Sequence, residues 1–441
     1  MTLIPAEQRQ FALHVVSQLR ASGFQALFAG GCVRDMLLGL TPTDYDVATN
    51  AQPPQIRQVF GKKRTLEIGA EFGVIAVVGP PSVGIVEVVT FRQDLGYSDG
   101  RRPDAVAFCT AEEDALRRDF TINGMFYDPV AETVIDYVGG QEDLHGKVVR
   151  AIGDPLARFT EDKLRMLRAV RFTARFGFRL EDATGAAIRQ MAPALASVSA
   201  ERIAAELRKL FVLPRRAQGL ELLRSTKLLG TILPEWNLAP SATPAELSVW
   251  EQTLGDIGGL SRPSFPLVLA MLVVGMAESA ALSHSETLGG VSGSPGARQI
   301  GETVLRVGRR WKLSNAEISQ TIWLAEQYVT QSLAQASSRP WSRVQPVLIQ
   351  PHIVELLDWT QTRPRGVSEA DLDYCRQKLN LTEGELNPPP LITGQDLIKQ
   401  GLRPGPTFAN LLQTLRNAQL DGQIVTQAEA IKFALQLMAR E

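Results

Sequence analysis

The sequence has few of the residues that build disulfide or zinc sites, and it lacks a hydrophobic run long enough to cross a membrane. Among its 441 residues are four histidines and three cysteines, Cys32, Cys109 and Cys375. The cysteines have no paired spacing, which excludes a disulfide scaffold or a cysteine-based zinc site and fits a reducing compartment. The longest strongly apolar stretch, residues 267–277, is well short of the roughly 20 residues that a bilayer requires. We therefore expect a cytoplasmic protein that has no contact with a membrane.

Neither sign of charge dominates the whole chain, yet charge is unevenly distributed. The 46 Lys and Arg residues nearly balance the 47 Asp and Glu residues, so the net charge of −1 indicates no general affinity for polyanions. Residues 145–216, however, carry 15 Lys or Arg and only 7 Asp or Glu, a local net charge of +8. Such a segment favours a phosphate-bearing partner or a solvated helix face with internal ion pairs. Charge alone leaves both interpretations open.

The hydrophobic pattern changes near residue 145. Before that point, β-branched runs alternate with helical patterns, which predicts strands at 26–29, 74–78 and 85–91, an extended segment at 43–47, and helices at 8–19 and 33–38. After it, amphipathic helical patterns dominate. A Gly- and Ser-rich stretch at 283–297 predicts a long loop, and the Pro-rich residues 387–390 separate a C-terminal module.

A Gly-Gly pair and two aspartates form the first candidate site. Gly30 and Gly31 end a predicted strand, where glycine lets the backbone approach a ligand and the following helix offers free N–H groups to phosphate. Asp44 and Asp46 are two residues apart on the expected extended segment, so both carboxylates project to the same face. Neighbouring carboxylates repel each other unless a cation lies between them. The spacing therefore predicts a Mg²⁺ site, with a solvated turn as the alternative.

A third acid, Glu87, lies inside the apolar run 85–91. A carboxylate there either faces water on a half-exposed sheet or is held for function. Together with Asp44 and Asp46 it would place three carboxylates on adjoining strands. That arrangement is typical of a two-metal site for phosphoryl or nucleotidyl transfer.

Seven distinctive strings are distributed along most of the chain, from residue 30 to residue 422. They are GGCVRDMLLGLTPTDYDVAT (30–49), VEVVTFR (86–92), GYSDGRRPDAVAF (96–108), RRDFTINGMFYDP (117–129), RFTEDKLRMLRAVRF (158–172), SAERIAAELRKLF (199–211) and LITGQDLIKQGLRPGPTFANLLQTLRNAQLDG (391–422). In this order they resemble the tRNA nucleotidyltransferase and bacterial poly(A) polymerase family, the class II branch of the polymerase β-like superfamily. The resemblance implies an α+β fold in which a nucleotidyltransferase head, a mixed sheet with helices, precedes an all-α remainder. The domains that it implies are a catalytic head (1–144), a neck with a nucleotide-base template (145–215), a body (216–386) and a tRNA-binding tail (387–441).

The resemblance also implies roles for individual residues. Asp44 and Asp46 would ligate the metal ion, and Glu87 would help to position the attacking hydroxyl. The nucleotide would contact Gly30, Gly31, Arg34, Arg118, Asp119, Asn123, Asp162, Arg165, Arg168 and Arg171. Within this set Asp119 and Asn123 would touch the sugar and Arg118 the phosphates, since Arg forks bidentately onto phosphate oxygens. The alternative for the Arg-Arg-Asp string is an ion-paired helix start.

Asp162 and Arg165 are the pair that addresses base choice. Three residues apart on one predicted helix, they share a face and could form a routine ion pair. They could instead select a base. Cytosine and adenine both present an amino donor beside a ring-nitrogen acceptor, which match an Asp acceptor and an Arg donor, whereas uracil and guanine mismatch both. The resemblance implies that the family uses such a pair in this way. Further along the same predicted helix, we expect a basic stripe formed by Arg168, Arg171, Arg175 and Arg179.

The expected activity is template-independent addition of CCA, or part of it, to the 3′ end of tRNA from CTP and ATP. The resemblance implies Mg²⁺ as cofactor and tRNA as partner, held at its acceptor stem and elbow, with no DNA involved. A loop at residues 99–102 resembles the family's flexible loop, which helps the pocket to change from C to A. Addition of the terminal A alone, or synthesis of poly(A), remains an alternative because those relatives share the same catalytic strings.

Overall fold

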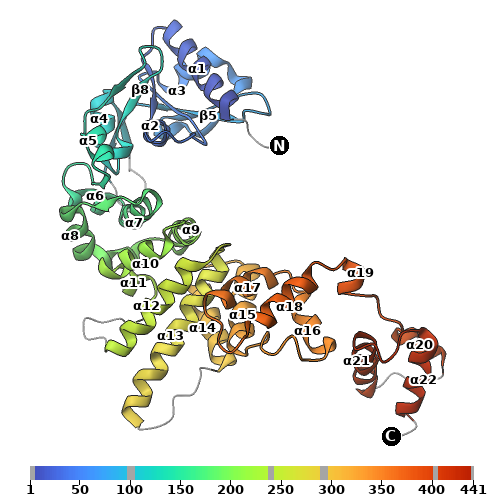
Figure 1. Cartoon of the computed structure of the whole chain (residues 1–441). Helices are drawn as coiled ribbons and strands as arrows, with labels where there is room; N and C mark the ends of the chain where they lie inside the picture. The colour runs from blue at the N-terminus through green and yellow to red at the C-terminus, as the bar shows by residue number, and fades with distance from the viewer. Residues whose placement is uncertain (1–4, 97–104, 237–242, 289–295, 401–405, 439–441) are drawn as a thin grey trace. The chain divides into compact units, whose positions relative to one another are not determined.

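The computed structural model forms two compact units, Met1–Ala239 and Pro240–Glu441, which are described separately (Figure 1). The structure describes residues 5–96, 105–236, 243–288, 296–400 and 406–438. The predicted loop at 99–102 lies outside these residues. The α+β fold class is confirmed, because a mixed sheet with helices occupies the first part of unit one and helices dominate the remainder of the chain.

A seven-stranded sheet organises the N-terminal half of the first unit. Its strand order is β3 (Thr65–Gly69), β4 (Val74–Val78), β5 (Ile85–Thr90), β2 (Asp46–Thr49), β1 (Ala26–Ala29), β8 (Phe126–Asp128) and β9 (Thr133–Ile135). Of these described pairings, β2 with β5 is parallel and the others are antiparallel. The predicted strand at 26–29 and the hairpin of β4 and β5 are confirmed.

Helices cover both faces of this sheet because its strands carry apolar side chains on both faces, as in β1, whose four residues are all buried. On one face, α1 (Pro5–Ala21) and α3 (Pro53–Phe60) contact the strands. On the other, Leu27 and Ala29 of β1 pack with two alanines of α4 (Ala111–Leu116). Phe91, which follows β5, meets Phe126 of β8 edge to face with ring centroids 5.7 Å apart. The buried sheet therefore supports the segments that follow β1 and precede β2, two of its central strands.

Two short segments deviate from their predicted form. The helix after the Gly-Gly pair, α2, spans Gly31–Leu37, so it starts at the second glycine rather than at Val33. The extended segment at 43–47 becomes a strand only from Asp46. Asp44 precedes β2 and is exposed, so the predicted alternation on one strand does not hold for both aspartates. A separate hairpin, β6 (Arg92–Leu95) with β7 (Ala105–Phe108), lies beside α4.

Helices follow the sheet within the first unit. They are α5 (Gly140–His145), α6 (Pro155–Glu161), α7 (Leu164–Phe176), α8 (Asp182–Met191), α9 (Ala200–Phe211), α10 (Arg216–Ser225) and α11 (Leu228–Ile232), with one parallel strand pair, β10 (Val148–Val149) and β11 (Arg179–Leu180). Helix α7 packs against α9 and α10 and ends at Gly177, whose φ of 68° suits glycine. Arg179 lies on β11, so its predicted place on the helical stripe is wrong.

The second unit is all helical in its described residues. It contains α12 (Pro244–Gly259), α13 (Phe265–Leu288), α14 (Ala297–Arg310), α15 (Asn315–Val329), α16 (Trp341–Leu348), α17 (Ile353–Thr362), α18 (Glu369–Leu379), α19 (Glu383–Leu386), α20 (Gly394–Lys399), α21 (Pro406–Leu420) and α22 (Gln427–Met438). The predicted loop at 283–297 is wrong in its first six residues, because α13 continues to Leu288. The expectation that no run is long enough to cross a membrane is wrong by length and composition, because the window Phe265–Leu282 of α13 meets both criteria. Yet 72% of that window is buried, which is typical of a core helix.

The last three helices share a hydrophobic core of their own. It joins Leu397 of α20, Leu415 of α21 and Ala434 of α22 with Ile392 and Ile424 from the connecting segments. The Pro-rich residues 387–390 lie between α19 and α20, as the sequence pattern predicts. The finer division into head, neck, body and tail stays a prediction.

Truncating the Phe91 side chain tests the packing that supports the sheet. Phe91 is 1% exposed, so Phe91→Ala leaves a cavity and should lower the free energy of unfolding by about 3–5 kcal/mol. Urea unfolding followed by circular dichroism measures this loss. Leu66→Ala, at a side chain that is 52% exposed, is the control and should change the stability by less than about 0.5 kcal/mol. Equal losses in the two variants would contradict the described core.

Candidate nucleotide-binding and catalytic site

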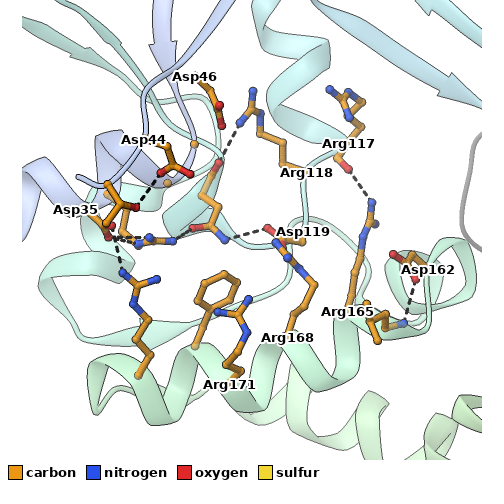
Figure 2. A pocket seen from close by; sticks show the side chains of 18 of the residues that line it. Asp35, Asp44, Asp46, Arg117, Arg118, Asp119, Asp162, Arg165, Arg168 and Arg171 are labelled. Atoms are coloured by element: carbon orange, nitrogen blue, oxygen red, sulfur yellow. Dashed lines mark hydrogen bonds and ion pairs between the residues drawn. The ribbon is translucent and has the colours of Figure 1, made fainter. Parts of the chain in front are cut away.

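One polar cavity of about 610 Å³ lies in the first unit, between the turn that follows β1 and helix α7 (Figure 2). Its wall includes Gly30, Gly31, Arg34, Asp44, Asp46, Arg118, Asp119, Asn123, Asp162, Arg165, Arg168 and Arg171. These are all of the predicted site residues except Glu87. Four separate segments of the sequence therefore converge on one pocket, and arginines and aspartates provide most of its charged surface.

The turn at Gly30 brings the backbone close to the arginines. Gly30 precedes α2 with φ 72°, a conformation that L side chains rarely adopt. A Cβ atom at Gly30 would lie 2.9 Å from Nη1 of Arg118. The backbone conformation therefore favours glycine here, and a Cβ at this position would force the Arg118 guanidinium to shift.

Asp44 and Asp46 lie together at one side of the pocket (Figure 2). Asp46 begins β2, and the pairing of Val47 with Val88 puts Glu87 beside Asp46 on the neighbouring parallel strand. Burial and the charges of Glu87 and Asp44 raise the pKa of Asp46 to about 7. Oxygen ligands that repel one another in this way fit a hard divalent cation, which would relieve the repulsion.

Glu87 is exposed on β5 and does not contribute to the cavity wall. Across the described ranges, no three His, Cys, Asp or Glu side chains are grouped as a metal site. The structure thus brings Asp44 and Asp46 to the pocket as a pair and leaves Glu87 at its margin. Its role as a third acid stays a prediction.

Asp114 holds both arginines of the Arg-Arg-Asp string. It lies within α4 and is 1% exposed. Its Oδ1 pairs with Arg117 at 2.7 Å and its Oδ2 with Arg118 at 2.9 Å. Burial alone would raise the pKa of Asp114, but the charges of Arg118 and Arg117 outweigh it and lower that pKa. Our sequence reasoning missed this residue. Its spacing of three and four residues from the two arginines was the available signal.

Asp119 connects the segment after α4 to helix α7. Its Oδ2 accepts from Arg168 Nη2 at 2.6 Å, and its Oδ1 accepts from Asn123 Nδ2 at 3.0 Å. Burial would raise the pKa of Asp119, but the charge of Arg168 and these hydrogen bonds outweigh it and lower the pKa to about 2. Asp119 is therefore a fixed carboxylate, able only to accept hydrogen bonds at neutral pH.

Arg34 extends this network from α2. Its Nη1 donates to Asn123 Oδ1 at 2.5 Å, and its Nη2 pairs with Asp35 at 2.6 Å. Asp35 also pairs with Arg175 of α7 at 3.3 Å. The Arg34 guanidinium lies 4.7 Å from the ring centroid of Phe176, within range of a cation–π contact. Neither Asp35 nor this aromatic support was predicted from the sequence.

Arg171 is more deeply placed than a simple phosphate contact. It is 7% exposed, and its Nε lies 2.6 Å from Glu206 of α9, a partner that sequence reasoning also missed. Its guanidinium lies 4.2 Å from the ring centroid of Phe172. Arg171 borders the cavity while it links α7 to α9, so its predicted contact with the nucleotide stays a prediction.

Asp162 and Arg165 reach the pocket, but not from one helix. Asp162 ends α6 in an extended conformation (φ −141°, ψ 105°), and Arg165 belongs to α7. The expectation that both lie on one helix is therefore wrong. Arg165 pairs with Glu161 at 2.7 Å, and Asp162 pairs with Arg202 of α9 at 2.7 Å. Arg202 is a further pocket residue that the sequence reasoning did not single out.

The pocket therefore has two chemically different parts. The carboxylates of Asp44 and Asp46 offer anionic oxygens for a cation, whereas the guanidinium groups along α7 and at Arg34 and Arg118 offer donors to phosphate oxygens (Figure 2). Asp162 and Arg165 add an acceptor and a donor at the end of the pocket near the start of α7. A nucleotide with its triphosphate and a metal ion matches this distribution of charge.

Three family models match the chain. The poly A polymerase head domain matches residues 26–150, and the RNA and SrmB-binding site of polymerase A matches residues 177–239. The tRNA nucleotidyltransferase domain 2 matches residues 299–434. The first two matches thus lie in the unit that holds the pocket, and the third lies in the helical second unit.

Curated relatives extend the similarity over the whole chain. The chain is 33% identical to the CCA-adding enzyme of Limosilactobacillus fermentum over 434 residues, which cover 97% of this chain and 96% of that enzyme. It is 44% identical to the CCA-adding enzyme of Geobacillus thermodenitrificans over 226 residues, about half of each protein.

Solved structures agree with this similarity. The chain superimposes on the Bacillus stearothermophilus CCA-adding enzyme in complex with CTP with a TM-score of 0.71 and 29% identity, over 98% of both chains. It also matches the Thermotoga maritima CCA-adding enzyme complexed with tRNA, with a TM-score of 0.64 and 21% identity, over 99% of this chain and 96% of that one. The second similarity concerns the fold alone.

The raised pKa of Asp46 predicts a pH-dependent cost to stability. When the pKa of an acid is higher in the folded protein than in the unfolded chain, the folded state becomes less stable as the pH rises. For Asp46 this loss falls between its ordinary pKa of 3.8 and its raised pKa of about 7. Asp46→Asn should therefore raise the stability of the protein in EDTA at pH 8 by roughly 1–2 kcal/mol, and by less at pH 5. Melting temperatures at the two pH values measure this.

Asp128 provides a control of opposite sign. It pairs with Arg20 at 2.8 Å, and its pKa is lowered because hydrogen bonds from Arg20 and the backbone outweigh its burial. Asp128→Asn should therefore destabilise the protein at pH 8. A lower stability of Asp46→Asn at pH 8 would refute the proposed repulsion between Asp46 and its neighbours.

Proposed function

The chain belongs to the family of CCA-adding enzymes, and from this premise we propose that it completes the 3′ end of tRNA with CTP and ATP. The observation that carries the proposal is the convergence in one pocket of paired carboxylates, arginines suited to a triphosphate, and the Asp162 and Arg165 side chains. A relative that is 33% identical over almost the full length of both chains supports the same activity.

The proposed reaction is nucleotidyl transfer. The 3′ oxygen of the tRNA forms a bond to the α-phosphorus of CTP or ATP, the bond to the β-phosphate breaks, and pyrophosphate leaves. Mg²⁺ held by Asp44 and Asp46 would supply Lewis-acid chemistry, lowering the pKa of the hydroxyl and balancing charge on the phosphates. Glu87, on the strand next to Asp46, would help to orient the attacking hydroxyl.

The remaining residues would bind and orient the nucleotide. The guanidinium groups of Arg118 and Arg34 lie beside the Gly30–Gly31 turn, where a triphosphate could also meet the backbone N–H groups at the start of α2. Asp119 and Asn123 present an acceptor and an amide suited to the ribose hydroxyls. Arg168 would act by holding Asp119, since their ion pair is 2.6 Å long.

Base selection would depend on Asp162 and Arg165. An Asp carboxylate accepts from the exocyclic amino group of cytosine or adenine, and an Arg guanidinium donates to the adjacent ring nitrogen. Uracil and guanine present a carbonyl and a ring N–H at those positions, so each would leave unsatisfied polar groups in the pocket. Such mismatches can cost several orders of magnitude in selectivity.

The helical second unit would bind tRNA by recognising the shape of the RNA. The family match at residues 299–434 supports this role for the body and for the C-terminal helices α20–α22. Recognition of an RNA helix through its backbone needs no base-specific contacts. A cytoplasmic location follows from the same proposal.

An addition assay tests this function directly. Three tRNA transcripts ending at the discriminator base, at C and at CC would each receive CTP, ATP or both, with Mg²⁺. Completion of all three to CCA is expected. Extension of the CC-ending transcript alone would show that the enzyme adds only the terminal A. Long A tracts would indicate a poly(A) polymerase.

Removing Arg165 tests the base template. Arg165→Ala should reduce the preference for CTP and ATP over UTP and GTP by about ten-fold or more, because the donor to the ring nitrogen is lost. Primer extension with each nucleotide alone measures the four values of kcat/KM. Unchanged selectivity would return Asp162 and Arg165 to a purely structural role.

A further inference from the structure

Each of the two proposed template side chains is paired with a charge outside the template. Among the described residues, no ion pair joins Asp162 to Arg165. Arg165 instead lies 2.7 Å from Glu161, and its Nη2 donates to the backbone carbonyl of Arg117 at 3.2 Å. Asp162 lies 2.7 Å from Arg202. The acceptor and the donor therefore do not neutralise each other, so both can face a base.

The Asp162 carboxylate is held at both oxygens. Its Oδ1 accepts from the backbone N–H of Leu164 at 3.0 Å, and its Oδ2 accepts from Nη2 of Arg202 at 2.7 Å. Because a carboxylate has about four acceptor directions, these two bonds fix its plane and leave others for a ligand. The backbone bond alone would still permit rotation of the second oxygen.

Arg202 enters this site from an independent element. It lies in the first turn of α9, 37 residues after Arg165, and it forms part of the cavity wall. Its side chain is 19% exposed and that of Asp162 is 16% exposed, so the pair borders the pocket rather than the core. A nucleotide base placed against Asp162 would lie next to Arg202 as well.

We propose that Arg202 is a positioning residue for base selection: its guanidinium orients the Asp162 carboxylate toward the amino group of cytosine or adenine. This inference rests on the proposed function. An unrestrained carboxylate could turn away from the base or admit water, and a misplacement of about 1 Å in such a site can cost up to 10²-fold in rate.

Alternative roles for Arg202 predict different kinetics. A contact to the triphosphate, or a purely structural role, would affect all four nucleotides alike, because they share the same phosphates and the same fold. If Arg202 acts through Asp162, its loss would lower kcat/KM for CTP and ATP more than kcat/KM for UTP and GTP. The ratio of kcat/KM values therefore distinguishes these roles where a single rate does not.

The experiment compares the full-length wild-type protein with Arg202→Met, Arg202→Lys and Arg189→Met. Methionine keeps the apolar stem but removes the charge, and Lys keeps the charge without the planar fork. Arg189 is an exposed residue of α8 outside the cavity wall and serves as the matched control. Single-nucleotide extension of a CC-ending tRNA and of a tRNA ending at the discriminator base gives kcat and KM for each nucleotide, and thermal melting reports folding.

For Arg202→Met, we expect kcat/KM for CTP divided by kcat/KM for UTP to fall about ten-fold, and the same quotient for ATP and GTP to fall as much. Arg202→Lys should fall between this variant and the wild type, and Arg189→Met should match the wild type. Equal losses for all four nucleotides, or unchanged ratios, would overturn the inference. If Arg202→Met does not fold, the ratio in Arg202→Lys decides in the same way. A wild-type protein that adds no nucleotide would instead refute the proposed function.

Discussion

The geometry of the pocket depends on the ion pair between Asp119 and Arg168. Asp119 follows α4 beside the sheet, Arg168 belongs to α7, and their side chains meet at 2.6 Å. From Asp119, hydrogen bonds continue through Asn123 and Arg34 to Asp35, which pairs with Arg175 on the same helix. The network thus leaves α7 at one residue and returns to it two turns later. It fixes the distance between α7 and the turn at Gly30.

Such a network contributes more to orientation than to stability. Removing charges from water costs about as much as a buried ion pair returns, so these contacts give little net stabilisation. Arg34, Arg168 and Arg175 would nevertheless repel one another without Asp35 and Asp119 between them. Pairing holds each guanidinium in place before any ligand arrives. A polyphosphate would therefore meet donors that need little further ordering, which is the condition under which electrostatic stabilisation of a transition state is most effective.

The sequence predicted which residues lie together better than it predicted their contacts, and their functional roles stay predictions. The strand at 26–29, the glycine turn and twelve of the thirteen predicted site residues converge as expected, because local patterns and a family resemblance both concern residue identity. The partners Asp35, Asp114, Glu206 and Arg202 were missed. Three of these pairings, Arg175–Asp35, Arg171–Glu206 and Arg202–Asp162, join different elements, and no spacing rule reports which distant charges meet. The prediction placed Asp162 on the same helix as Arg165, because the sequence around it has a helical pattern. In the structure, α6 ends at Glu161 and α7 begins at Leu164, so Asp162 lies between the two helices.

The distribution of counter-charges separates two tasks within one pocket. The arginines suited to phosphate are held by Asp35, Asp114 and Asp119, whereas the residues suited to the base are held by Glu161 and Arg202. The two groups meet at Arg117, whose side chain pairs with Asp114 and whose carbonyl accepts from Arg165. We therefore expect that a change of base preference near Asp162 leaves the proposed triphosphate contacts undisturbed. Such a separation would let one set of phosphate contacts serve two different bases.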